Sequence, residues 1–246
     1  MPNLKDAIEI RSSRRKYIPE ALNPTAAKQL QILIEDLTNT TNLKIQLLID
    51  DGDAFNGFKK SYGMFSGVRN YIALIGDKED NLNLEKLGYF GELLVLGATM
   101  FGLGTCWVGG TFDRKSCPVK LEENESIVCA ITVGEVAPEM SKKEKLIRWA
   151  THRKTKTAEQ MYTSDETVPE WFLSGIRAVQ KAPSAINRQP VMFSYSRDDV
   201  VTASVKDITI EGIAFDLGIA KAHFEIGAGG GRWDFGNGGK FYKKCG

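Results

Sequence analysis

The sequence GYFGELLVLGATMFGLG occupies residues 88–104 and would be apolar on every face of a helix. Such a helix either crosses a membrane or lies inside a larger fold. Glu85 and Lys86 precede it and Glu92 and several glycines interrupt it, whereas a membrane helix needs roughly 20 mainly apolar residues. The segment therefore predicts a buried helix of a soluble fold. A second segment, GIAFDLGIAKAHFEIG at residues 212–227, has a similar composition.

Helix and strand patterns alternate around these two segments. Asn23 and Pro24 suit an N-cap and a first helical position, and Leu and Ile then recur at helical spacing. Residues 167–170 (TVPE) match a capping box and predict a helix that begins there. Runs rich in Val, Ile and Leu predict four strands. They lie at residues 43–50, 70–76, 126–136 and 191–196.

The order helix, strand, glycine-rich apolar helix occurs twice along the chain. This weak repeat predicts an α+β or α/β fold with two-fold pseudo-symmetry inside one chain. The tail after residue 227 is rich in glycine, and we predict no regular structure for it.

Charge and composition narrow the class of protein. The 246 residues include 32 Lys and Arg against 31 Asp and Glu, which gives a net charge of +1 and argues against a general nucleic-acid binder. No secretory signal is evident in the first 15 residues. Four cysteines without C-x-x-C spacing and only two histidines argue against a metal site. We therefore expect a reduced, cytoplasmic protein without a metal.

The segment RSSRR at residues 11–15 is the first candidate binding motif. Arginine guanidinium groups bind phosphate oxygens in pairs, and serine hydroxyls donate further hydrogen bonds. Taken alone, the segment is better explained as a solvated basic helix end. Arg153 lies in a second basic cluster, which is a solvated face unless Arg153 folds back towards Arg11 and Arg15.

The segment APSAINRQP at residues 182–190 is the second motif. Its two prolines fix the backbone at both ends, so that Ser184, Asn187 and Gln189 point in defined directions. Amide side chains both donate and accept, which suits the edge of a heteroaromatic ring. A rigid connection between a helix and a strand is the alternative interpretation.

The segment GLGTCWVGG at residues 102–110 is the third motif. Glycines on both sides of Trp107 allow a flat ligand to approach the backbone closely. The glycine spacing matches neither a dinucleotide-binding fingerprint nor a P-loop. Cys106 is expected to be a packed thiol, because only two histidines exist to activate it.

Together the three segments resemble the flavin-dependent nitroreductase family. Its members typically carry R-x-S-x-[RK], A-P-S-x-x-N-x-Q-P and G-L-G-T-x-W-x-G-G segments. In most members the proline-serine loop precedes the glycine-tryptophan segment, but here it follows. This order resembles a branch in which one chain contains both halves of the usual homodimer. Val191 stands where members usually have an aromatic residue.

The resemblance implies an α+β nitroreductase-like fold, with a central mixed sheet flanked by helices. It implies a single-chain pseudo-dimer with halves at residues 1–160 and 161–246, and it favours a monomer over a homodimer. The implied cofactor is FMN. Its phosphate would be held by Arg11, Ser13 and Arg15, with Ser12 close by and Arg153 as a further contact. The ring and ribityl chain would meet Pro183, Ser184, Ala185, Asn187 and Gln189, and the backbone of Trp107, Val108, Gly109 and Gly110 would lie near flavin N5 and O4.

The implied activity is an oxidoreductase that works by a ping-pong mechanism. NADH or NADPH would give hydride to flavin N5, and a nitroaromatic, quinone or similar small molecule would accept the electrons. No catalytic side chain is assigned, and neither a nucleic-acid nor a membrane partner is expected. Three alternatives stay open: a flavin-binding protein without turnover, an enzyme of the same fold that consumes its flavin, and a plain interaction domain.

Overall fold

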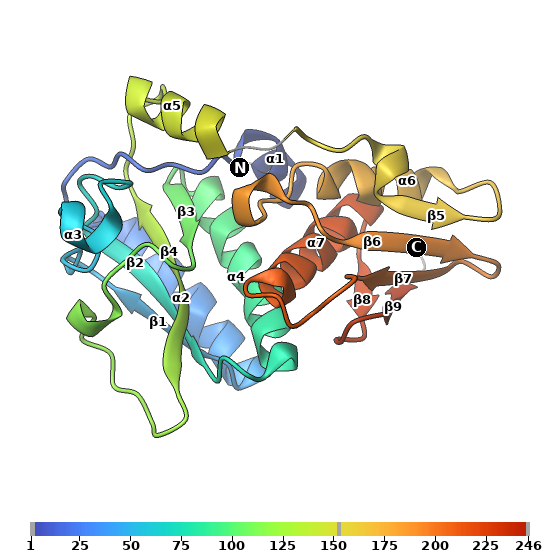
Figure 1. Cartoon of the computed structure of the whole chain (residues 1–246), viewed down its shortest axis with the longest axis horizontal. Helices are drawn as coiled ribbons and strands as arrows, with labels where there is room; N and C mark the ends of the chain where they lie inside the picture. The colour runs from blue at the N-terminus through green and yellow to red at the C-terminus, as the bar shows by residue number, and fades with distance from the viewer. Residues whose placement is uncertain (1–2, 152–153, 245–246) are drawn as a thin grey trace. The chain divides into compact units, whose positions relative to one another are not determined.

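The computed structural model describes residues 3–151 and 154–244 (Figure 1). The fold is α+β, as predicted, and the β-structure of the described residues forms two sheets. The chain divides into two compact units. Unit 1 contains Ile10–Glu79 and Leu94–His152, and unit 2 contains Pro2–Glu9, Asp80–Leu93 and Arg153–Gly246. The predicted halves, 1–160 and 161–246, stay a prediction.

Unit 1 contains a four-stranded antiparallel sheet in the order β1-β2-β4-β3. Every residue of β2 is buried, which explains its uninterrupted apolar sequence, whereas β1 at the edge is only partly buried. Phe55 stacks on Phe112 at 5.3 Å and meets Tyr71 edge-on, next to this sheet. The strands are β1 (Lys44–Leu48), β2 (Asn70–Gly76), β3 (Gly104–Val108) and β4 (Ser126–Gly134).

The helices of unit 1 differ strongly in burial. Helix α2 (Pro24–Thr41) begins as predicted, because the Asn23 side chain accepts the Ala26 N–H at 2.9 Å and Pro24 is the first helical residue. Helices α3 (Phe58–Ser61) and α5 (Lys142–Thr151) carry exposed lysines and aromatic residues.

Unit 2 contains a five-stranded sheet in the order β5-β6-β7-β9-β8, in which β5 and β6 run parallel and the other neighbours antiparallel. Its core is aromatic: Phe224 stacks on Phe193 at 4.9 Å and meets Trp233 at 5.5 Å. The strands are β5 (Tyr162–Ser164), β6 (Met192–Ser196), β7 (Val200–Ser204), β8 (Gly231–Trp233) and β9 (Gly239–Lys243), and the helices are α1 (Leu4–Ile10), α6 (Glu170–Val179) and α7 (Ile213–Ala228).

Helix α4 (Asn81–Met100) contributes its first part to unit 2, where it crosses α7 at very close range. A Cβ on Gly218 would lie 1.9 Å from the Glu85 carbonyl oxygen, so only glycine fits there. Both apolar segments form buried helices, as predicted. The acids that interrupt the first one are buried as well, Glu85 against Lys221 and Glu92 against His223. No helix of the described residues is long and apolar enough to cross a membrane.

Two local predictions were wrong. Helix α6 begins at Glu170 with Pro169 as its N-cap residue, and no side chain caps it, so the predicted capping box does not form. Proline disfavours helical geometry in the residue before it, and the helix therefore cannot start earlier. The tail after residue 227 is ordered into β8 and β9, where Gly231 leaves room for Phe241: a Cβ there would lie 2.3 Å from that ring.

Candidate functional site

The arginine-serine segment runs alongside β3 in unit 1. Ser13 forms a parallel bridge with Thr105, and the Arg14 N–H donates to the Thr105 carbonyl at 2.8 Å. One step further, Lys16 bridges Ser66. Because neighbouring side chains of an extended segment point to opposite faces, Arg14 on one side and Ser13 and Arg15 on the other are held apart.

Arg14 points into the protein and is 7% exposed. Its Nε lies 3.3 Å from Glu144 Oε1, and its Nη2 donates to the Ala137 carbonyl at 2.9 Å. The same Glu144 carboxylate accepts the Arg15 and Lys16 N–H groups at 2.8 and 3.1 Å. Glu144 thus fixes the backbone on either side of Arg15.

Glu144 also caps the start of helix α5, through hydrogen bonds with Ser141, the residue before the helix. Its Oε2 accepts the N–H and the hydroxyl of Ser141 at 2.8 and 2.9 Å, and Ser141 Oγ accepts the Glu144 N–H in return. Burial disfavours the charged form, but the hydrogen bonds from Arg15, Ser141 and Lys16 outweigh it and lower the Glu144 pKa to about 2. The carboxylate is therefore ionised at neutral pH.

Arg15 and its neighbours surround a cationic pocket of about 370 Å³ in unit 1. This volume lies within the range of small-molecule and cofactor sites. The helix α5 N-terminus faces it through Ser141, and its partial positive charge adds to that of the side chains. The pocket is lined by Arg15, Lys16, Met64, Ser66, Ser141, Lys142, Lys143, Glu144 and Ile147.

Arg11, Ser13 and Arg15 lie near the thiol of Cys106 on β3. Burial raises the Cys106 pKa, while the charges of Arg15 and Arg11 and a hydrogen bond with Ser13 oppose the rise. Since the thiol is only 3% exposed and its pKa is raised, it is a packed thiol and not a nucleophile. Ser12 is partly buried in the same segment.

The third motif forms the end of β3 and the turn that follows it. Val108 is buried and Trp107 partly buried, whereas Gly109 and Gly110 are exposed. Nothing lies within 4 Å of a Cβ built on either glycine, so both leave open space for a flat ligand against the backbone. Arg114 Nη2 donates to the Gly109 carbonyl and thereby steadies the turn.

The proline-serine loop lies in unit 2 and carries backbone strain. Ile186, Asn187 and Gln189 all have positive φ, at 49°, 52° and 46°. A β-branched residue in this region is a true outlier, and such residues cost on the order of 1–2 kcal/mol each. Strain of this kind concentrates at functional sites.

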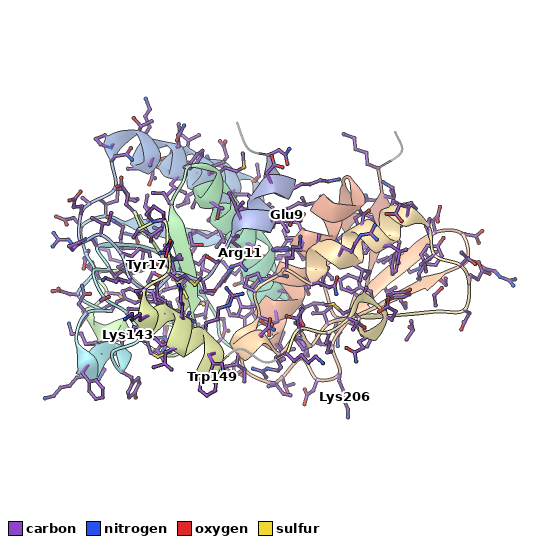
Figure 2. The ribbon with its side chains drawn as sticks, turned by 90° about the horizontal axis from the view of Figure 1, so that it is seen from above. Glu9, Arg11, Tyr17, Lys143, Trp149 and Lys206 are labelled. Carbon is purple, nitrogen blue, oxygen red and sulfur yellow. The ribbon has the colours of Figure 1, made fainter. Side chains whose placement is uncertain are left out.

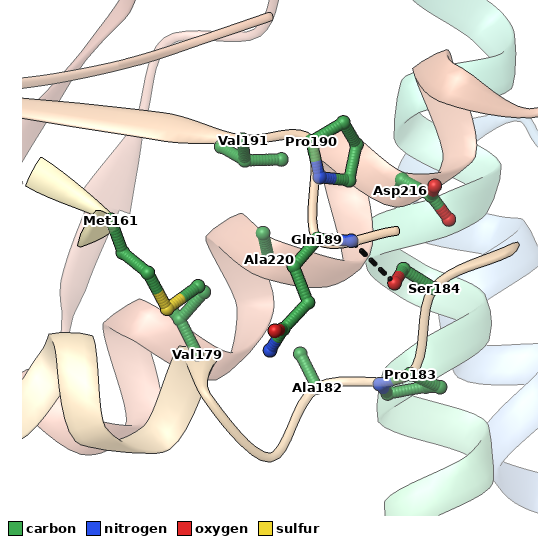
Figure 3. A pocket seen from close by; sticks show the side chains of 10 residues that line it. All are labelled: Met161, Val179, Ala182, Pro183, Ser184, Gln189, Pro190, Val191, Asp216 and Ala220. Carbon is green, nitrogen blue, oxygen red and sulfur yellow. Dashed lines mark hydrogen bonds between the residues drawn. The ribbon is translucent and has the colours of Figure 1, made fainter. Parts of the chain in front are cut away.

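Internal hydrogen bonds hold the loop in this conformation. Ser184 Oγ accepts the Gln189 N–H at 2.9 Å (Figure 3). The Gln189 amide is fully engaged, since Oε1 accepts the Lys156 N–H at 2.8 Å and Nε2 donates to the Gln180 carbonyl at 3.1 Å. Gln189, which is 4% exposed, therefore supports the loop from inside.

Asp216 is a residue of this loop region that the sequence analysis missed. It lies on α7 beside the loop, and its Oδ1 accepts the Ala185 N–H at 3.1 Å (Figure 3). Its other oxygen, Oδ2, is buried without a hydrogen-bond partner among the described residues. Burial raises the Asp216 pKa to about 7, against the opposing effects of the Ala185 N–H and Arg188. An acid within the largely apolar segment 212–227 was the available signal.

The predicted cofactor residues thus form two groups. Unit 1 brings the arginine-serine segment and the end of β3 together, and Figure 2 labels Arg11 in the first of these. Unit 2 holds Pro183, Ser184, Ala185, Asn187 and Gln189 in one strained loop, where Pro183 lines a small pocket and Asn187 Nδ2 donates to Thr155 at 3.4 Å. Arg153 lies outside the described residues.

We compared the chain with known protein families and solved structures. The family model described as "Putative TM nitroreductase" matches residues 3–228. A solved structure from Thermotoga maritima with a similar description shares 20% sequence identity at a TM-score of 0.61, and the match covers 98% of this chain and 92% of that one. At this identity the likeness shows the fold. No curated protein matches the sequence.

Two other solved structures are less similar. A nitroreductase family protein from Clostridium novyi NT shares 18% identity at a TM-score of 0.44, over 58% of this chain and 91% of that one. An FMN-dependent nitroreductase from Clostridium difficile R20291 shares 16% identity at a TM-score of 0.43, over 61% of this chain and 98% of that one.

Proposed function

Because this chain belongs to the TM nitroreductase family, we propose that it is an FMN-dependent oxidoreductase. Its reductant would be NADH or NADPH, and its acceptor a nitroaromatic, a quinone or a similar small molecule. The observation that carries the proposal is the arrangement in unit 1, where the arginine-serine segment is fixed along β3 beside a cationic pocket of about 370 Å³.

The residues of unit 1 fit a ligand with a phosphate at one end. Arg15 lines the cationic pocket, and Glu144 fixes its backbone while Arg14 neutralises that carboxylate from within. Arg11, Ser12 and Ser13 supply further donors for a phosphate. The open backbone at Gly109 and Gly110 suits the edge of a flat ring.

The loop of unit 2 would contribute contacts to the ring and the ribityl chain. Ser184 and Gln189 hold the loop, so that Pro183, Ala185 and Asn187 are presented without a rearrangement upon binding. The bound FMN would supply the redox chemistry, taking hydride from the nicotinamide and passing electrons to the acceptor. The protein's residues bind, orient and exclude water, and none is proposed to transfer a proton.

A single-chain pseudo-dimer that acts as a monomer is part of the proposal. The two glycine-rich helices, α4 and α7, and the repeated order of elements support it. Size-exclusion chromatography with light scattering would test it, because a homodimer in solution would contradict it.

The first test is the absorbance spectrum of the purified protein, with the cofactor identified after heat release. We expect flavin bands and free FMN. Arg15→Ala should lower the FMN content, whereas Lys28→Ala, which removes an exposed charge from α2, should leave it unchanged. A colourless protein that also fails to bind added FMN would contradict the proposal.

Steady-state kinetics then separates the alternatives. Parallel lines with NADH or NADPH and a quinone would support the ping-pong scheme, and intersecting lines would count against it. Bound FMN without turnover would favour a flavin-binding protein. A changed mass of the flavin after reduction in air would favour an enzyme that consumes it.

A further inference from the structure

Four of the most exposed large hydrophobic side chains lie on or beside helices α3 and α5 of unit 1. Trp149 is 80% exposed, Phe58 77%, Tyr62 69% and Leu146 61%; among the described residues, only Ile10 at 63% is comparable. Figure 2 shows the Trp149 side chain pointing away from the ribbon. Water-exposed aromatic side chains that cluster in this way mark an interaction surface.

The segment that follows α3 meets helix α5. A Cβ on Gly63, just after α3, would lie 3.4 Å from Phe58 Cδ2 and 3.9 Å from Lys143 Nζ on α5. Along α5, Glu144 is buried and Ile147 lines the pocket, so one face of the helix points inwards. Leu146 and Trp149, three residues apart, share the outer face.

The charged residues of these two helices are mostly cations. Helices α3 and α5 contain six cations and a single acid, Glu144, whose carboxylate is buried against Arg14. Asp113 also interacts with Lys60. We name the whole surface the α3–α5 patch. It consists of Phe58, Lys59, Lys60, Tyr62, Lys142, Lys143, Lys145, Leu146, Arg148 and Trp149.

We propose that the α3–α5 patch docks the protein on the surface of a membrane that contains anionic lipids. The aromatic side chains and Leu146 would enter the interface between headgroups and acyl chains, and the cations would contact lipid phosphates. The negative potential of such a surface attracts lysine and arginine side chains. This contact is peripheral, and it differs from our expectation of no membrane partner.

Charge and side-chain chemistry favour a lipid surface over other occupants. A second copy of the chain docked through the same patch would bring six cations against six, which is repulsive. Nucleic acid would match the charge, but Leu146 has no ring on which a base can stack. An apolar aliphatic side chain beside Trp149 on one helix face suits the acyl boundary.

Sedimentation with lipid vesicles tests the proposal, and it does not depend on the flavin. The full protein should bind vesicles of equimolar phosphatidylcholine and phosphatidylglycerol, bind less as salt is added, and not bind phosphatidylcholine alone. Failure to bind the anionic vesicles at low salt, or equal binding to both compositions, would overturn the proposal. FMN content is measured on the same samples, so failure of the proposed flavin function remains a separate result.

Matched variants localise the contact. The double variant Phe58→Ala/Trp149→Ala should weaken binding at least about tenfold, since each ring contributes buried apolar area. Lys59→Glu/Lys145→Glu should abolish it. The control Lys206→Glu/Ile210→Ala changes an exposed lysine and an exposed isoleucine of unit 2 and should bind normally. Because all these side chains are exposed, circular dichroism should show an unchanged fold. Unchanged binding by the patch variants would place the contact elsewhere and refute the assignment.

Discussion

Lys221 Nζ lies 2.6 Å from Glu85 Oε1, and neither side chain is more than 1% exposed. The ammonium also donates to the carbonyls of Asp234 and Gly236 at 3.0 Å, while Glu85 Oε2 accepts the Gly236 N–H at 2.7 Å. Burial lowers the Lys221 pKa, and the charge of Glu85 opposes this effect. The pair ties α4, α7 and the β8–β9 connection of unit 2 together.

Removal of one member of this pair should destabilise the fold strongly. Lys221→Met leaves Glu85 as an uncompensated buried charge, and we expect a loss of about 3–5 kcal/mol in the free energy of unfolding, measured in urea. Glu85→Gln/Lys221→Met should recover part of the loss. Lys181→Met breaks the exposed pair with Glu9 instead, and a cost above about 1 kcal/mol there would show that burial is not the deciding factor.

Because of Glu144, the free energy of unfolding should decrease as the solution becomes acidic. Its pKa is about 2 in the folded protein and about 4.5 in the unfolded chain, so folding favours the ionised form. This contribution is fully present above pH 4.5 and is lost as the pH falls through 2.

At neutral pH the loss in Glu144→Gln is expected to be on the order of 3 kcal/mol. In urea unfolding, the difference in the free energy of unfolding between Glu144→Gln and the wild type should be smaller at about pH 3 than at neutral pH. Glu122→Gln is the control, because that carboxylate is 79% exposed and pairs with Lys44 at the surface. An equal effect of both substitutions would contradict this assignment.

The effect of Asp216 on stability should have the opposite sign: the free energy of unfolding should fall as the pH rises. Its folded pKa of about 7 lies above the unfolded value of 3.8, so the folded state favours the protonated acid. Stability from this group is full below pH 3.8 and is lost as the pH rises through 7.

Asp216→Asn should remove this pH dependence and stabilise the protein at about pH 8, by an amount on the order of 4 kcal/mol. Unfolding in urea at about pH 5 and pH 8 measures it. Asp207 is exposed, and Asp207→Asn should not change the difference in the free energy of unfolding between about pH 5 and pH 8. If the free energy of unfolding of Asp216→Asn still changed with pH as it does in the wild type, Asp216 would not be the group responsible, and its carboxyl would have to be ionised in the folded protein.

The strained loop predicts a stabilising substitution. Ile186 has φ of 49°, which glycine adopts freely, and its side chain is 49% exposed, so little packing is lost. Ile186→Gly should raise the free energy of unfolding by about 1 kcal/mol. Ile210 is 48% exposed without positive φ, and Ile210→Gly should lower it by about 0.5–1 kcal/mol. Destabilisation by both would show that φ at Ile186 carries no strain.

Helices and strands that depend on residues close together in the sequence were predictable from it. Strands β2 and β4 are continuous runs of branched apolar residues, and Asn23 caps α2 through a bond to a residue three positions away. Strand β3 was not predicted, because its glycine-containing sequence favours a loop and it is stabilised by pairing with β4 and with the arginine-serine segment. The same holds for β8 and β9, which depend on aromatic packing across the sheet.

The candidate site was predictable as a set of segments but not as an arrangement. No role was predicted for Arg14, which turns inwards because its partner, Glu144, comes 130 residues later. Likewise, Gln189 was expected among the flavin contacts, but its side-chain amide forms hydrogen bonds with the backbone of Lys156 and Gln180. Side-chain direction here depends on contacts that are distant in sequence.

The interleaving of the two units has a consequence for synthesis on the ribosome. Residues 3–9 belong to unit 2 but are translated before unit 1, and most of unit 2 follows residue 153. At 5–20 residues per second, helix α1 waits on the order of ten seconds or more for its neighbours, while the sheet of unit 1 is completed. Nascent chains therefore expose the apolar side of α1 during this interval, and chaperone binding to partial chains should peak before unit 2 is translated.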